Sequence, residues 1–99
     1  GAFTKNLKEL RFHLCQTSPQ SQGLREFLTK NYPTIKQANP GLPILIREAH
    51  GVNASIYARY NFARESKASV DGLTSSDIGK HLEQLIKSAD STETPRISN

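Results

Sequence analysis

Apolar and polar residues alternate along residues 8–14 and again along residues 56–62, and this period of two is typical of β-strands with one apolar face. A weaker pattern over residues 67–70 predicts a further short strand after a turn around residues 64–66. The residues expected to point toward the core are Leu10, Phe12, Leu14, Ile56, Ala58, Tyr60 and Phe62. The opposite side of the first strand is polar, so we expect these strands to bury only one face.

The run Pro43–Glu48 has a different pattern. Its apolar residues are consecutive and turn residues bound it, which is typical of a short buried strand. Residues 50–55 read as a loop that leads to the strand at 56–62.

The pair Ser18-Pro19 predicts the start of a helix, because serine caps helix N-termini and proline is tolerated at the first helical position. Leu24, Phe27 and Leu28 then follow the i, i+3, i+4 spacing of an amphipathic helix.

Pro33 limits the length of this helix, because proline lacks an amide hydrogen and clashes with the preceding turn. We expect an end or a kink near residues 31–32 and a short further helix that carries Ile35 and Ala38. The Asn-Pro-Gly sequence at residues 39–41 stops it.

Residues Thr74 to Asp77 form a variant of the capping box, with Asp in place of Glu or Gln, and predict a second helix that runs to about Ser88. Its apolar stripe consists of Ile78, Leu82, Leu85 and Ile86.

The predicted order of elements is therefore β-α-β-β-β-α. A strand–helix–strand unit gives parallel strands with a right-handed crossover, and a hairpin and a closing helix follow. This is a reduced thioredoxin-like α/β fold, a four-stranded mixed sheet with two main helices on one face. Residues 49–55 are too few for the helix that a full thioredoxin has on the other face. We assign residues 1–89 to this domain and the polar residues 90–99 to a flexible tail.

The bulk composition fits one small globular domain. The chain has 99 residues, 35% of them hydrophobic, and a mean hydropathy of −0.56. No apolar run approaches the roughly 18 residues needed to span a bilayer, so no direct membrane insertion is expected. The net charge of +4, from 13 basic and 9 acidic residues, is compatible with an acidic partner or RNA but selects neither.

Cys15 is the only cysteine, and it follows the first predicted strand at the place where thioredoxin-type proteins hold their reactive thiol. Ser18 stands where the second thiol of a Cys-x-x-Cys motif would lie. Two interpretations stay open: a monothiol whose pKa is lowered by Ser18 and the helix N-terminus, or a small buried residue at a vestigial redox position. The missing partner favours the second interpretation.

The polar faces of the strands form the other candidate site. Arg11, His13, Arg47, Tyr57 and Arg59 should all point away from the helices. Because no helix is predicted on that side, we expect this face to bind a partner, with arginine and tyrosine as anchors. The alternative is a solvated face with ordinary cross-strand pairs, for example to Glu9 or Glu48.

Other site chemistry has no support in the sequence. The histidines at positions 13, 50 and 81 do not have metal-ligand spacing. The chain has no Gly-x-Ser-x-Gly elbow and no phosphate-binding loop. We expect no cofactor, no metal and no catalytic residue.

Four segments together resemble a known family. They are residues 10–18 (LRFHLCQTS), 21–28 (SQGLREFL), 39–48 (NPGLPILIRE) and 58–60 (ARY). In this order they are similar to the small thioredoxin-like accessory subunits of mitochondrial complex I, NADH:ubiquinone oxidoreductase, a domain family shared with two mitochondrial ribosomal proteins. The resemblance covers roughly residues 5 to 88.

The resemblance implies a peripheral, matrix-side position at the mitochondrial inner membrane, on the peripheral arm near the NADH-oxidising module. It implies that the large iron–sulfur subunit is the partner, that there is no small-molecule substrate, and that the role is stability or assembly rather than catalysis. Animal members have a second cysteine at the position of Ala49 and a proline at that of Ala54. Their absence here argues against a dithiol switch.

Two other functions stay open. One is a monothiol oxidoreductase that uses Cys15. The other is a mitoribosomal protein of the same domain family that contacts RNA through basic residues of the sheet, with Tyr57 stacking on a base. Acidic residues interspersed among the basic ones, and the small net charge, disfavour nucleic acid.

Overall fold

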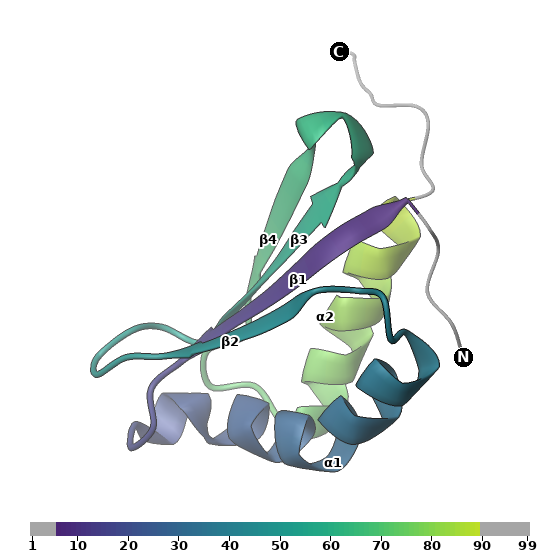
Figure 1. Cartoon of the computed structure of the whole chain (residues 1–99). Coiled ribbons are helices and arrows are strands. Elements are labelled where there is room, and N and C mark those ends of the chain that lie inside the picture. Colours follow the sequence, from purple (N-terminus) through teal and green to yellow (C-terminus); the bar gives the residue numbers. More distant parts are fainter. Residues whose placement is uncertain (1–5, 90–99) are drawn as a thin grey trace.

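The computed structural model describes residues 6–89, which form a four-stranded sheet with two helices packed on one face (Figure 1). The predicted polar tail at residues 90–99 lies outside the described residues. In chain order the elements are β1 (Leu7–Leu14), a 3-10 turn (Pro19–Ser21), α1 (Gln22–Ala38), β2 (Ile44–Glu48), β3 (Ser55–Tyr60), a second 3-10 turn (Asn61–Ala63), β4 (Glu65–Ser69) and α2 (Ser75–Ser88).

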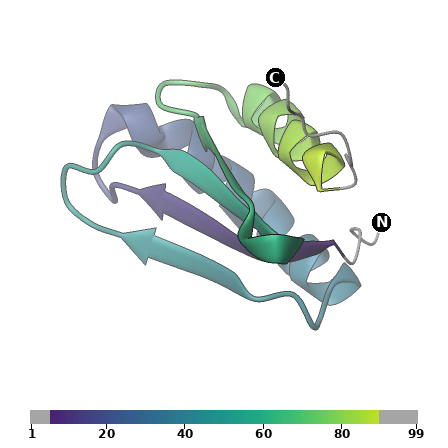
Figure 2. The same ribbon diagram turned by 90° about the horizontal axis from the view of Figure 1, so that it is seen from above.

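The strand order across the sheet is β2-β1-β3-β4. β1 pairs parallel with β2 and antiparallel with β3, and β3 pairs antiparallel with β4. α1 forms the crossover from β1 to β2, while both helices lie on the same side of the sheet (Figures 1 and 2). The predicted reduced thioredoxin-like α/β fold is confirmed, and no described element covers the second face of the sheet.

The second helix begins where its capping residue predicts, whereas Ser18 caps a 3-10 turn and α1 itself begins at Gln22. The Ser18 hydroxyl accepts a hydrogen bond from the Gln20 amide at 3.1 Å and caps the short 3-10 turn that leads into α1. The Thr74 hydroxyl accepts from the Asp77 amide at 3.2 Å, and α2 ends at Ser88. Each hydroxyl satisfies an amide that has no partner within its own helix.

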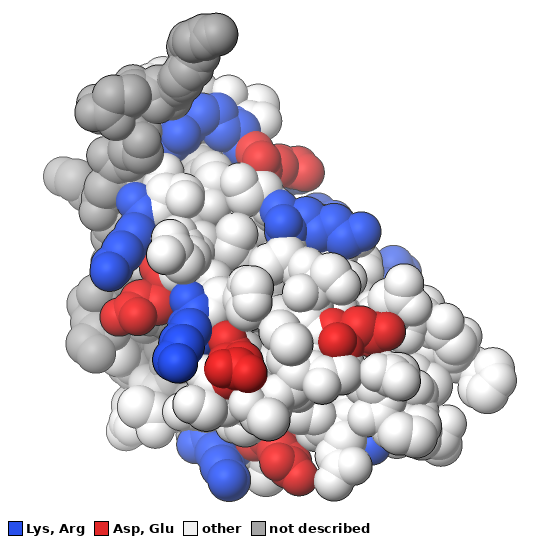
Figure 3. Space-filling view, turned by 180° about the vertical axis from the view of Figure 1, so that it is seen from behind, with Lys and Arg blue, Asp and Glu red and all other residues white. Residues whose placement is uncertain are grey.

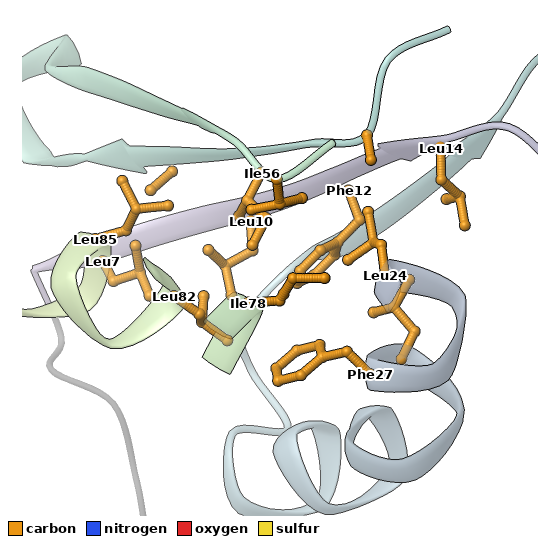
Figure 4. Close-up of a cluster of buried hydrophobic side chains, with 14 of the residues drawn as sticks. Leu7, Leu10, Phe12, Leu14, Leu24, Phe27, Ile56, Ile78, Leu82 and Leu85 are labelled. Carbon is orange, nitrogen blue, oxygen red and sulfur yellow. The ribbon is translucent and has the colours of Figure 1, made fainter. Parts of the chain in front are cut away.

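The core lies between the sheet and the helices (Figure 4). The alternating residues of β1, Leu10, Phe12 and Leu14, are fully buried, as their period predicts. Gly23 lies where α1 meets the loop before α2, and a Cβ there would collide with the Leu73 carbonyl oxygen. The other elements contribute to the same core Leu24, Phe27, Ile56, Ala58, Ile78, Leu82 and Leu85, among others.

Of the predicted end or kink near residues 31–32, the end is wrong, because α1 continues to Ala38 as one helix with Pro33 inside it. A proline in a helix interior costs about 3 kcal/mol or more. Packing beyond it opposes this cost, since Ile35 lies against the core and the Lys36 ammonium donates to the Leu42 carbonyl at 2.8 Å. Tertiary contacts therefore extend the helix past a residue that would end it in isolation.

The prediction that the strand at 43–48 is buried is also wrong. β2 is an edge strand, because β3 pairs with the far side of β1 and leaves β2 with one neighbour. Leu45 is 50% exposed and Ile46 is 42% exposed.

The turn after β3 lies at residues 61–63 rather than at 64–66, and β4 begins at Glu65. Phe62 was expected to face the core but is 91% exposed. Phe62 and Ala63 have φ angles of 60° and 61°, which take them out of the strand alternation. Tyr60 is thus the last residue of β3 that faces inward.

Candidate functional site

The uncovered face of the sheet holds the residues that the sequence analysis assigned to partner binding. Side chains alternate along each strand, and the register places Leu45, Arg11, Tyr57 and Lys67 in one row across the sheet. We define the open face as Glu9, Arg11, His13, Leu45, Arg47, Tyr57, Arg59, Glu65 and Lys67. Each of the predicted residues, Arg11, His13, Arg47, Tyr57 and Arg59, lies on it.

Glu9 joins two arginines at one end of the open face. Its carboxylate lies 3.0 Å from Arg11 Nε and 3.6 Å from Arg59 Nε, and Arg59 Nε is also 3.6 Å from the Glu65 carboxylate. The hydrogen bond to Glu9 raises the pKa of Arg11 above its usual value, so this guanidinium stays charged. Surface ion pairs of this kind contribute little to stability, because solvent screens them. They orient the arginines more than they stabilise the fold.

A ring pair occupies the middle of the open face. The ring centroids of His13 and Tyr57 are 4.6 Å apart, and Lys67 Nζ lies 5.3 Å from the centroid of the Tyr57 ring. Burial lowers the pKa of His13 below its ordinary 6.5, and the charges of Arg47, Arg11 and Lys67 lower it further. The imidazole is therefore neutral at pH 7, and an aromatic pair with one cation over it faces solvent.

Arg47 and Leu45 lie beside this pair on β2. Within residues 6–89, no carboxylate lies at ion-pair distance from Arg47. A groove along this edge is lined by Arg11, His13, Leu45, Ile46, Arg47 and Glu48. Arginine and aromatic residues are enriched at protein interfaces, and Leu45 adds exposed apolar surface beside them.

Leu45, Glu9, Glu65 and Lys67 were not named as site residues from the sequence. Leu45 carried a usable signal, because it is two positions from Arg47 in the same strand and must share its face. Glu48 lies on the other side of β2 and accepts a hydrogen bond from the Gln16 side chain at 2.8 Å instead of pairing with an open-face arginine.

Cys15 follows β1 directly and is 2% exposed. Its sulfur accepts a hydrogen bond from the Gly51 amide at 3.4 Å and lies 3.7 Å from the Thr17 hydroxyl oxygen. The Gly51 bond is the largest cause that lowers the pKa of Cys15 to about 6, followed by Thr17 and the Ser18 backbone, while burial acts the other way. The thiolate is stabilised, but a reagent has little access to it.

The loop formed by residues 49–54 brings the Gly51 amide to the Cys15 sulfur. It crosses the end of β1, where the Ala49 amide donates to the Leu14 carbonyl at 3.1 Å. Arg25 of α1 fixes the segment after β1 to this helix. Its Nη1 donates to the carbonyl oxygens of Cys15 and Ser18 at 2.8 Å and 3.0 Å. The Ser18 hydroxyl serves as a helix cap, and the contact with Gly51 had no signal in the sequence.

The described part of the chain holds no group of three or more His, Cys, Asp or Glu side chains that could bind a metal ion. Within the same residues, no helix has both the length and the apolar character to cross a membrane.

Charges of both signs are mixed on the surface. Figure 3, which views the molecule from behind Figure 1, shows basic and acidic side chains interspersed among uncharged ones. On the open face itself, Glu9 and Glu65 lie among the arginines. Such a surface differs from the continuous basic stripe that is typical of RNA-binding proteins.

Comparison with known proteins gives a consistent result. The profile of the mitochondrial ribosomal protein L51 / S25 / CI-B8 domain matches residues 24–75. The chain is 50% identical over 88 residues to NADH dehydrogenase [ubiquinone] 1 alpha subcomplex subunit 2 of Arabidopsis thaliana, covering 89% of this chain and 91% of the relative. It is 45% identical over 86 residues to the NADH-ubiquinone oxidoreductase 10.5 kDa subunit of Neurospora crassa (87% and 92%). It is 41% identical over 80 residues to the mouse alpha subcomplex subunit 2 (81% of each chain).

Proposed function

The chain belongs to the mitochondrial ribosomal protein L51 / S25 / CI-B8 domain family, and from this membership and the names of its relatives we propose that it is an accessory subunit of mitochondrial complex I without a catalytic centre of its own. One observation carries the proposal: plant, fungal and mouse relatives named as subunits of this enzyme match over most of both chains.

The proposed mechanism is docking of the open face onto a larger subunit. Arg47 and Leu45 would enter the interface core, while the Glu9–Arg11–Arg59 group would lie at its polar rim. A stable interface buries about 800 Å² per partner, an area within reach of a four-stranded sheet face. Binding of this kind stabilises the partner's folded state by mass action and requires no chemistry.

The resemblance to the complex I accessory subunits also suggests where in the complex this chain lies. The subunit would lie on the matrix side of the inner membrane, on the peripheral arm near the NADH-oxidising module, with the large iron–sulfur subunit as partner. Its role would be to stabilise or help assemble this arm. No small-molecule substrate or cofactor enters the proposal.

Native co-purification tests this function. The chain is expressed with an affinity tag in mitochondria, membranes are solubilised gently, and the co-purifying proteins are identified against a tagged, unrelated matrix protein as control. Recovery of complex I subunits, with the large iron–sulfur subunit among the most abundant, is the expected result. Recovery of ribosomal RNA and ribosomal proteins instead would assign the chain to the ribosomal branch of the family and refute the proposal.

A second candidate, a monothiol redox protein, rests on the hydrogen bonds to the Cys15 sulfur and its lowered pKa. The 2% exposure of Cys15 opposes it, because a nucleophilic thiol must be reached by its substrate. A titration with a thiol reagent at pH 7 separates the two. A rate near that of a free thiol would support redox chemistry, and strong protection would exclude it.

A further inference from the structure

Phe62 has a position that the proposed docking of the open face does not explain. It lies in the turn between β3 and β4, which projects from the sheet at the top of Figure 1, away from α1. Its side chain is 91% exposed, whereas the other large exposed hydrophobic residues described, Leu45 and Ile46, are 50% and 42% exposed. A phenylalanine exposed to this extent leaves most of its apolar surface in water.

The backbone of this turn is also unfavourable. Phe62 has φ 60° and ψ 32°, and Ala63 has φ 61°, so two consecutive residues with side chains adopt the left-handed conformation. Glycine or asparagine adopts it at a lower energetic cost, and a bulky residue there is an outlier. A sequence selected only for the stability of this turn would place glycine at these positions. Outliers of this kind concentrate at functional sites, where surrounding contacts maintain them.

Contacts on both sides of the turn hold it in one conformation. The Tyr60 amide donates to the Arg64 carbonyl at 2.7 Å and the Asn61 amide donates to the Asn6 carbonyl at 3.1 Å. The Arg64 guanidinium lies 5.1 Å from the centroid of the Tyr60 ring and donates to Asn61 Oδ1 and to the Ala89 carbonyl, both at 3.3 Å. Phe62 is therefore presented on a preorganised support, which lowers the entropic cost of binding.

We propose that Phe62 is an anchor residue that inserts into an apolar pocket on another subunit of complex I. This inference rests on the proposed function, and it adds a second contact at the far end of the β3–β4 hairpin. A single aromatic side chain in a buried pocket is a common hot spot of protein interfaces. A membrane surface fits less well, because interfacial binding needs a broad apolar face, whereas the turn offers one aromatic residue between Asn61 and Glu65.

The test uses opposite expectations for stability and assembly. In Phe62→Gly the anchor is removed and the backbone strain is relieved, so the thermal midpoint of the isolated full chain should stay equal or rise. Ala63→Gly is the matched control, because it relieves strain at the neighbouring residue and keeps the phenylalanine. Each variant is co-expressed with the wild-type chain under a distinguishable tag, and mass spectrometry of purified complex I gives the ratio incorporated.

Incorporation of Phe62→Gly should fall about tenfold or more relative to wild type, as expected for the loss of a hot-spot aromatic. Ala63→Gly should compete equally with wild type. Equal incorporation of Phe62→Gly would overturn the inference and leave the proposed function intact. Absence of the wild-type chain from complex I would instead refute the proposed function, and the inference with it. Self-association of the isolated chain that depends on Phe62, measured by sedimentation, would also overturn it by assigning the anchor to a second copy.

Discussion

Reversal of the charge of Arg47 tests the open face most sharply, because this residue contributes little to the fold. Arg47 is exposed on the edge strand β2, and no carboxylate within residues 6–89 pairs with it. Surface substitutions away from specific contacts usually change stability by less than about 0.5 kcal/mol. For a domain of this size that corresponds to a change in thermal midpoint below about 4 °C.

The effect on docking should be much larger. Loss of one partner of a buried, hydrogen-bonded charge pair across an interface costs about 2–5 kcal/mol, or about 30-fold to several thousand-fold in affinity. Arg47→Glu should therefore nearly vanish from complex I when it competes with wild type. Because a glutamate beside His13 removes one of the charges that lower its pKa, the His13 pKa should also rise.

The assay is competitive incorporation, with equal amounts of differently tagged wild-type and variant chains and a mass-spectrometric ratio in purified complex I. Lys30→Glu is the matched control, because Lys30 is an exposed residue of α1 on the opposite side of the domain from the open face. It should incorporate like wild type. Incorporation of folded Arg47→Glu at the level of Lys30→Glu would refute the assignment of the interface to the open face.

Three further predictions concern the fold and the thiol. Because the folded pKa of Cys15 is about 6 and its ordinary value is 9.0, the thiolate stabilises the fold at high pH, and this contribution is lost as pH falls through about 6. The difference in unfolding free energy between wild type and Cys15→Ser, measured by urea unfolding, should therefore grow from pH 6 to 9. A pH-independent difference would contradict the lowered pKa. Tyr60→Phe removes the hydroxyl that donates to the Leu85 carbonyl of α2 at 2.7 Å. It should lower the free energy of unfolding by about 1–3 kcal/mol. An unchanged urea midpoint would show that this hydrogen bond makes no net contribution to stability. Gly23→Ala should lower the free energy of unfolding by about 1–3 kcal/mol or more, because the added Cβ would collide with the Leu73 carbonyl oxygen. Gly41→Ala should be close to neutral in the same assay, because no atom lies within 4 Å of its added Cβ. Equal effects of the two substitutions would refute the close approach of Gly23 to Leu73.

The elements that the sequence predicts correctly are those set by local chemistry. The alternation at Leu10, Phe12 and Leu14 predicts both the strand and its buried face, because side-chain direction follows the backbone period. Thr74 and Asp77 predict the start of α2, because capping depends only on neighbouring amides. The same alternation places Arg11, His13 and Tyr57 on one face once the strands pair.

The errors occur where distant parts of the chain decide the outcome. Pro33 lies inside a helix because packing beyond it outweighs a local penalty. The burial of Ile44–Glu48 depends on the strand order, and an apolar run alone does not reveal that β2 has only one neighbour. Phe62 continues the alternation in sequence but enters a left-handed turn. Contacts with both ends of the domain hold this turn, because the Asn61 amide donates to the Asn6 carbonyl and Arg64 donates to the Ala89 carbonyl.

In the candidate site, too, the features that follow from local pattern were predictable and those that depend on distant contacts were not. The open-face arginines and Tyr57 were predictable from strand period, whereas the pKa of Cys15 depends chiefly on Gly51, which the fold brings from another loop. Spacing along the chain carries no information on such a contact, because loop path and not local propensity sets it.

A cryo-EM map of complex I purified with this chain tests the central claim most directly. The account predicts that the chain is present and that its open face, with Arg47, Leu45 and Tyr57, is covered by another subunit while the outer sides of α1 and α2 remain exposed. A map in which the helices form the contact and the open face is in solvent would contradict the docking mechanism. A map without the chain would contradict the function itself.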